Sequence, residues 1–311
     1  MILRRAIVGV GVVVVSAVSI GSGAFFGVLG APGARGYTAG KFAFEYGGRS
    51  AEVESAEGGH AVPGATTRYE DITVKAGPGL PKALCASLPA VAAARVGEGA
   101  IVLADFDGKA RSRLEFSSAL VTEVGFPACD AGSKDPAFLT LRFSPEIVRA
   151  KPGDGKASTA TVPAVQKTWL PRNFRLRIDG IADASTSKVT AVDALVLKQK
   201  VVDDATGRAR AAAGAPSVSN LVFTISEADG APFQAWYDQV VGKGPAAPRN
   251  GSIDYLSPTG DVLLHVDMRG LAVFKLTHDK VEARNEQIRR IKMEATVASA
   301  AIGCDTGFWA K

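Results

Sequence analysis

The stretch IVLADFDGKARSRLEF (101–116) alternates apolar and polar residues on both sides of a short polar segment that contains a glycine. The stretch IDYLSPTGDVLLHVDM (253–268) repeats this pattern 152 positions later. Alternation with a period of two is typical of a half-buried β-strand, and Asp-Gly or Thr-Gly between two such runs is typical of a hairpin turn. Each stretch therefore predicts an antiparallel β-hairpin with one buried face and one polar face.

The match between these two stretches continues into a later strand without a gap. Apolar residues meet apolar residues, and glycine meets glycine, at the same shift of 152 positions. A match of this length predicts a tandem duplication. The matched pairs are Ile101 with Ile253, Leu103 with Tyr255, Gly108 with Gly260, Leu114 with Val266, Phe116 with Met268, Leu139 with Ile291, Leu141 with Met293 and Phe143 with Ala295.

Upstream of the hairpins, a strand and a helix are predicted in each copy. The strands ITVKAGPG (72–79) and FTISEADG (223–230) align at a shift of 151. Helix-like stretches follow them, LPKALCASLPAVAAARV (80–96) and APFQAWYDQVVGKG (231–244), and each has a proline near its start.

The copies begin with the alternating strands KFAFEYGG (41–48) and NFRLRIDGI (173–181), which align at a shift of 132. The second copy therefore has about 20 extra residues before its middle strand, most of them in 201–219, which is predicted to be a flexible loop. Each copy is expected to be a mostly antiparallel β-domain with one helix (α+β), folded as a barrel or sandwich. The predicted organisation is a hydrophobic segment (1–35), a first β-domain (38–150), a linker (151–171), a second β-domain (172–303) and a C-terminal tail (304–311).

This order of elements resembles the phage tail tube family, which includes contractile-tail tube proteins and the tube protein of type VI secretion systems. The resemblance is carried by NFRLRIDGI, by the strand KVTAVDALVLKQK (188–200) that follows it, and by EVESAEGGHAVPGATTRYEDITVKAG (52–77) in the first copy. It covers residues 41–150 and 172–303. Its motifs are short strand patterns rather than chemical signatures.

The resemblance implies β-barrel or sandwich subunits that form six-membered rings, which stack into a hollow tube. Two such domains in one chain imply that three chains present six domains, a pseudo-hexameric ring. The expected function is structural, in a phage-tail-like or contractile injection apparatus, and the expected partners are copies of the chain and other tail or baseplate-like proteins. The alternative is an exported or membrane-anchored β-domain binding module at the cell surface.

The N-terminus departs from the family, whose tube proteins normally lack an export segment. Arg4 and Arg5 precede residues 6–31, which contain no charge and are long enough to span a bilayer. A signal peptide, with its apolar region over 6–20 and small residues near 22–24, is the competing interpretation. A third is an apolar arm that packs inside an assembly. An exported or membrane-anchored location is predicted, with a cytoplasmic assembly or virion-like particle as the alternative.

Composition gives little sign of other functions. The net charge is +5, but no dense Lys/Arg block with interleaved aromatic residues occurs, so nucleic-acid binding is not expected. Cys85, Cys129 and Cys304 form no CxxC pair, which argues against zinc. They are expected to be small buried residues, although one disulfide is conceivable in an exported protein.

No catalytic constellation stands out in the sequence, so no enzyme is predicted and no catalytic, cofactor-binding or metal-binding residue is assigned. His60 and His278 are placed in loops, and His265 on the polar face of a strand; none has a second ligand at metal-binding spacing. The segments DFDGK (105–109) and SPTGD (257–261) suit hairpin turns better than Ca²⁺ loops.

Two aromatic pairs remain. Trp236 and Tyr237 have the spacing of a helix core face. Phe308 and Trp309 follow the last predicted strand, and they are expected either to dock on a neighbouring subunit or to pack on their own domain.

Overall fold

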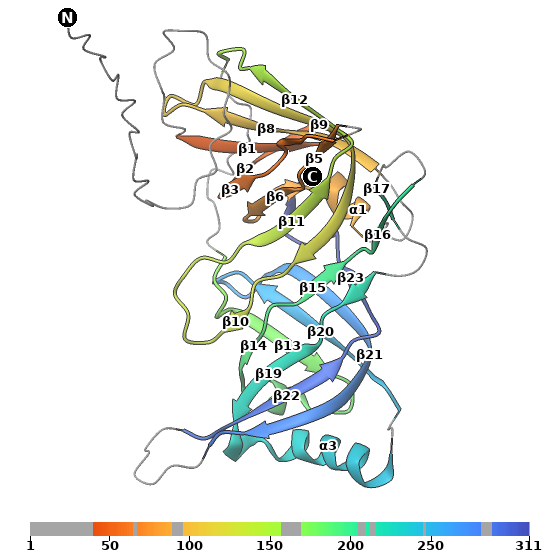
Figure 1. The fold of residues 1–311 in the computed structure, drawn as a ribbon. Helices are drawn as coiled ribbons and strands as arrows, with labels where there is room; N and C mark the ends of the chain where they lie inside the picture. The colour runs from red at the N-terminus through yellow and green to blue at the C-terminus, as the bar shows by residue number, and fades with distance from the viewer. Residues whose placement is uncertain are drawn as a thin grey trace, which may run out of the picture.

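The structure is a computed structural model that describes residues 40–64, 67–88, 96–156, 169–204, 209–211, 216–244, 247–280 and 288–310 (Figure 1). The fold is mostly β, as predicted. The predicted hydrophobic segment, residues 1–35 with its apolar part 6–31, lies outside the described residues. No helix within the described ranges is long and apolar enough to cross a membrane.

The first half of the fold is a curled antiparallel sheet with the strand order β2-β1-β8-β9-β11-β6-β3. Its end strands β2 and β3 are separated in the chain only by Glu54, whose N–H donates to the Lys75 carbonyl at 2.8 Å. The sheet therefore forms a nearly closed barrel. Its elements are β1 (Lys41–Tyr46), β2 (Arg49–Val53), β3 (Ser55–Glu57), β4 (Ala61–Val62), β5 (Arg68–Tyr69), β6 (Ile72–Ala76), β7 (Leu80–Pro81), α1 (Lys82–Ser87), β8 (Val96–Ala104), β9 (Ala110–Gly125), β10 (Cys129–Asp130), β11 (Leu139–Ser144) and β12 (Ile147–Pro152).

The second half has a sheet with the strand order β10-β14-β19-β22-β21-β20-β13. A 3-10 turn, η2, and helix α3 separate β19 from β20. Its elements are β13 (Phe174–Ile178), α2 (Asp183–Thr186), β14 (Val189–Val192), β15 (Val196–Lys198), β16 (Val201–Asp203), β17 (Ala209–Ala211), β18 (Ser217–Val218), β19 (Leu221–Ser226), η2 (Glu227–Asp229), α3 (Ala231–Lys243), β20 (Arg249–Leu256), β21 (Val262–His278), β22 (Arg290–Thr296), β23 (Ser299–Ile302) and β24 (Trp309–Ala310).

Both predicted hairpins form, as β8–β9 and β20–β21. Their turns use Gly108 and Gly260, whose φ angles of +76° and +86° favour glycine. Strands alternate buried and more exposed residues, as in Leu221–Ser226, because one sheet face packs into the core. The buried core is continuous through both halves.

Strands β8, β9 and β11 of the first half pair in the same register as β20, β21 and β22 of the second half. Equivalent residues in these strands are 152 positions apart. A bulge occurs at Gly97/Gly99 and again at Arg249/Gly251. A positive φ occurs at Ser118 (51°) and again at Gly270 (68°). Corresponding pairs are Phe44–Ile101 and Leu176–Ile253, Val102–Arg113 and Asp254–His265, Gly99–Phe116 and Gly251–Met268, and Leu141–Val124 and Met293–Leu276.

The predicted alignment of the middle strands is wrong by two residues. Leu141 pairs with Val74, and its counterpart Met293 pairs with Phe223, so the shift between β6 and β19 is 149 rather than 151. A slip of two residues keeps every side chain on the same sheet face, so alternation in the sequence cannot detect it.

Three other predicted elements differ from the structure. The strand 188–200 is divided into β14 and β15, which belong to different sheets. The loop 201–219 contains the hairpin β16–β17 and the strand β18 within its described residues. The helix predicted over 80–96 is the short α1, and residues 89–95 lie outside the described part.

Candidate functional site

The junction between the halves is built by strand pairing. From the second half, β15 lies along the edge of β9 in the first half, with Leu197 opposite Val124 and Lys198 opposite Glu123. The Lys198 Nζ is 3.2 Å from the Glu123 Oε2. The Gln199 N–H also donates to the Thr122 carbonyl at 2.8 Å. The sheet of the first half is therefore extended by a strand from the second.

The exchange is reciprocal. From the first half, β10 lies along β14, with Cys129 opposite Val192 and Asp130 opposite Ala191. Main-chain hydrogen bonds of this kind add affinity whenever an exposed sheet edge accepts a strand. The junction is therefore a directional contact in which each half supplies one short strand and accepts another.

The C-terminal tail crosses back to the first half. β24 pairs in parallel with β7, and the Gly79 N–H donates to the Phe308 carbonyl at 2.6 Å. The Phe308 ring is fully buried, 5.2 Å from the ring of Trp169 between centroids. The sequence predicts that Phe308 and Trp309 either dock on a neighbouring subunit or pack on their own domain. Neither alternative holds as stated, because the two residues pack within the chain but bridge its two halves.

A disulfide between Cys85 and Cys304 joins α1 to this tail. The alternative of one disulfide therefore holds for these two, and the expectation of a small buried residue without a disulfide does not. It holds for Cys129, which is buried as a thiol. Burial raises the pKa of the Cys129 thiol to about 12, so the thiol stays protonated and unreactive.

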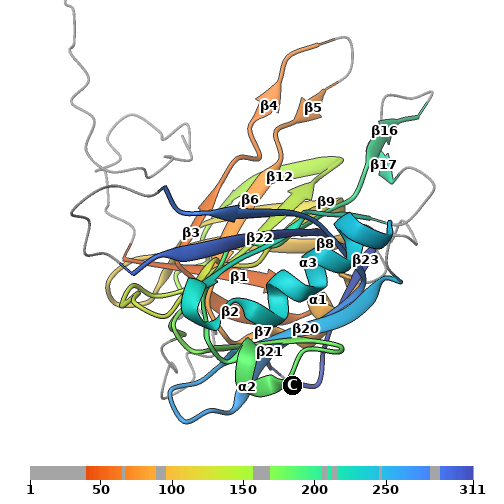
Figure 2. The ribbon, with the colours of Figure 1, turned by 90° about the horizontal axis from the view of Figure 1, so that it is seen from below.

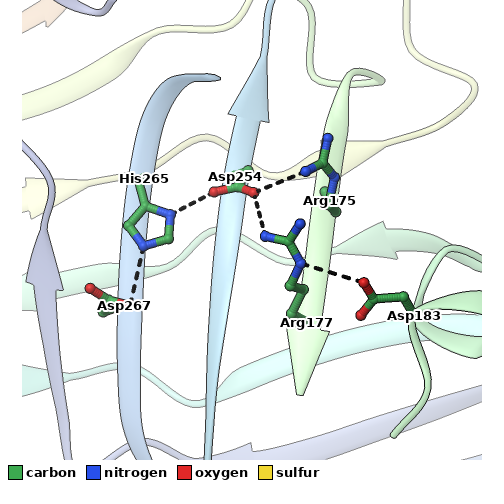
Figure 3. Close-up of polar contacts among 6 residues, drawn as sticks. All are labelled: Arg175, Arg177, Asp183, Asp254, His265 and Asp267. Carbon is green, nitrogen blue, oxygen red and sulfur yellow. Dashed lines mark hydrogen bonds and ion pairs between the residues drawn. The ribbon is translucent and has the colours of Figure 1, made fainter. Parts of the chain in front are cut away.

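A charged network covers the polar face of β13, β20 and β21 (Figure 3). Its centre is Asp254, a buried carboxylate that accepts from Arg177 at 3.0 Å and bonds His265 at 2.5 Å. Arg175 lies 3.7 Å from the same carboxylate. The second nitrogen of His265 lies 3.1 Å from Asp267. Positive and negative groups alternate across the three strands, which keeps the buried charge of Asp254 compensated.

Within the network, His265 is held between two carboxylates. Burial alone would lower the pKa of His265, but its hydrogen bonds to Asp254 and Asp267 outweigh burial and raise the pKa above its ordinary value. The imidazolium form then donates from both nitrogens to carboxylates, so the ring has no nitrogen left to act as a base. Over the described ranges, no group of three or more His, Cys, Asp or Glu residues is arranged to hold a metal ion.

The raised pKa of His265 predicts a pH-dependent contribution to stability. A histidine whose folded pKa exceeds its unfolded value of about 6.5 stabilises the fold fully below that pH, and the stabilisation is lost as pH rises through the folded pKa. The difference in unfolding free energy between wild type and His265→Gln should therefore shrink as pH rises. Urea unfolding of both proteins at several pH values measures this difference, and a difference independent of pH would contradict the assignment.

A second network occupies the corresponding face of the first half. Arg113 pairs with Glu45 at 2.7 Å and with Glu115 at 3.1 Å, and Lys151 pairs with Glu115 at 2.7 Å. Arg113 and Glu115 correspond to His265 and Asp267 at the shift of 152. An open groove of about 500 Å³ lies over this network. Both halves thus carry a self-compensating charged network on the same outer face.

Three further residues singled out in the sequence, His60, His278 and Trp236, lie away from the network around Asp254. His60 lies in the β3–β4 loop, as predicted. His278 is the last residue of β21 rather than a loop residue, and its Nδ1 lies 3.2 Å from Glu227. Trp236 is buried on the core face of α3, as predicted, and the Arg249 guanidinium lies 4.9 Å from its ring centroid. None of these three joins the network around Asp254.

Comparison with known proteins gives little support for a family. No family model matches the chain, and no curated protein matches it. Thirteen chains of solved structures match. In one, the six-fold symmetrised cryo-electron microscopy structure of the anti-feeding prophage baseplate, the match covers 46% of this chain and 97% of the other, at 13% identity and a TM-score of 0.35. A similarity this weak carries no weight for fold or function.

Proposed function

We propose that the chain is a structural protein made of two tail-tube-like domains, and that it assembles with copies of itself into a ring or tube. The observation that carries the proposal is the junction between its halves, where β15 extends the sheet of β9. This contact joins different surfaces of two similar units. A heterologous contact of that kind, repeated between chains, produces a closed ring or an open filament.

The likeness of the two units supports a tandem duplication. The strand order β1-β8-β9-β11-β6-β3 has the counterpart β13-β20-β21-β22-β19-β14. The shared bulge and the shared positive φ at Ser118 and Gly270 add to the likeness, because neither is required by alternation alone. If each half is one unit of a six-unit ring, as the resemblance to the tail tube family implies, three chains complete it.

The disulfide supports a location in an oxidising compartment, because such bonds persist mainly in exported proteins. The uncharged run of residues 6–31 points the same way. We propose that the chain is exported or membrane-anchored, and that its partners include other tail or baseplate-like proteins. No catalytic role is proposed, since the charged groups gathered on the polar faces neutralise one another.

An exported binding module at the cell surface is the second candidate. The same disulfide and apolar segment favour it, and it differs from the first candidate in requiring no self-association. Fractionation with N-terminal sequencing tests the location that both share. Electron microscopy of the purified full-length protein separates them: rings or tubes support the first candidate, and isolated single chains at high concentration would leave only the second.

A further inference from the structure

We propose that β4 of one copy pairs with the open edge of β21, residues Lys275–Thr277, in a second copy. This inference rests on the proposed self-assembly and names the contact that makes it. The inference follows from the junction between the halves, where β15 pairs with β9. The counterparts of these two strands are β4 and β21, and they do not pair with each other in the described structure.

The first counterpart is a sheet edge. In the first half, Glu123 to Gly125 pair with β11 on one side and with β15 on the other. In the second half, the corresponding residues of β21, Lys275 to Thr277, pair with β22. No other described strand pairs with β21 at these residues.

Helix α3 also packs against β21, but the side chains at this edge are more exposed than those at the occupied edge of β9. Thr122, beside the occupied edge, is 8% exposed, whereas its counterpart Phe274 is 46% exposed. Val124, which pairs with β15, is buried, and its counterpart Leu276 is only half-buried. An exposed phenylalanine beside an unpaired strand edge is a typical site for pairing with another chain.

The second counterpart is a hairpin. β15 pairs with β18, Leu197 opposite Val218 and Lys198 opposite Ser217. β4 pairs with β5 in the same register, Ala61 opposite Tyr69 and Val62 opposite Arg68. The shift from β4 to β15 is 136 positions, as it is from Ala56 in β3 to Val192 in β14. The shift from β5 to β18 is 149, as it is from β6 to β19.

The hairpin β4–β5 projects from the body of the protein (Figure 2). Its Ala61 is exposed and its Val62 is 42% exposed, whereas Leu197, at the position of Ala61, is buried in the junction. A short apolar strand is thus presented to solvent in one half, and a strand edge next to the exposed Phe274 is presented in the other.

The internal junction fixes the expected register. Within the chain, Leu197 lies opposite Val124 and Lys198 lies opposite Glu123. The equivalent contact between two copies places Ala61 opposite Leu276 and Val62 opposite Lys275. Pro63 stands where Gln199 stands, and proline has no N–H. The counterpart of the Gln199–Thr122 hydrogen bond is therefore not formed, and the contact between copies is shorter than the contact within the chain. A weaker contact suits an assembly that forms from separately folded chains.

Each copy offers one hairpin and one edge, at different places on its surface. A second copy that accepts the hairpin still offers its own hairpin to a third. The contact is therefore directional and repeats until a ring closes. The partner is a second copy of this chain, because the open edge of β21 corresponds to the edge of β9. A strand of this chain, β15, already pairs with that edge of β9.

The test is disulfide trapping between two differently substituted full-length chains produced together. One chain carries Val62→Cys and an affinity tag, and the other carries Lys275→Cys without a tag. These positions correspond to Lys198 and Glu123, whose side chains meet at 3.2 Å in the internal junction. Oxidised samples are separated without reductant, and the expected product contains one chain of each kind.

The matched control replaces Lys275→Cys by Lys292→Cys. Lys292 lies on β22, across β21 from the open edge, so its thiol should not be trapped by the tagged chain. An assembly visible by electron microscopy that gives no Val62–Lys275 product would overturn this contact and leave the proposed function standing. A wild-type protein that stays monomeric would overturn both.

Discussion

Replacing Phe308 by alanine should lower the free energy of unfolding by about 3–5 kcal/mol, the usual effect of removing a fully buried phenylalanine. The ring packs against Trp169 and Trp309, and the main chain at Phe308 bonds to Leu263 and Gly79. The truncation leaves a cavity where the tail from the second half meets the first. Denaturant unfolding of the wild type and of Phe308→Ala, compared at equal slope, measures the loss.

Phe106→Ala is the matched control for this substitution. Phe106 lies in the β8–β9 turn and is 77% exposed, so its removal should change stability by no more than about 0.5 kcal/mol. Equal stabilities of the two variants would mean that the C-terminal tail does not hold the halves together.

Removing the disulfide should have an effect of similar size. The bond between Cys85 and Cys304 closes a loop with a sequence separation of 219 residues. On the loop-entropy account, replacing both cysteines by serine should lower the unfolding free energy by about 5 kcal/mol, because the unfolded chain regains that freedom. Denaturant unfolding with and without reductant measures the effect.

The double serine variant also serves as the control for the reductant. Reductant should destabilise the wild type and leave Cys85→Ser/Cys304→Ser unchanged, since Cys129 forms no disulfide. A thiol count of three in the unreduced, denatured wild type would contradict the bond directly.

Local sequence patterns were sufficient to predict the hairpins and the shift between them. Alternation and turn glycines are short-range signals, and they gave β8–β9 and β20–β21 together with the register that places 101 and 253 at equivalent positions. The same signals do not distinguish a shift of 151 from one of 149, because both put the same residues on the buried face.

The junction could not be predicted in this way. β10 and β15 contain two and three residues, too few to show a period, and their partners lie in the other half of the chain. The pairing of Cys85 with Cys304 likewise depends on where the C-terminal tail folds. Spacing along the sequence does not specify contacts of this kind.

The charged network was within reach of the sequence but was missed. A hairpin centred on the SPTGD turn places Ile253 opposite Val266, and therefore Asp254 opposite His265. Counting that register would have brought the two side chains together. To predict that Arg175 and Arg177 join this network, one must also know that β13 lies beside β20. Alternation alone does not show which strands are neighbours.

The mass of the purified full-length protein, measured across a range of concentrations, decides whether this chain associates head to tail with itself. We expect a particle of several chains, with three as the number that completes a six-unit ring, visible as a closed ring by electron microscopy. A particle of one chain at every concentration would contradict it.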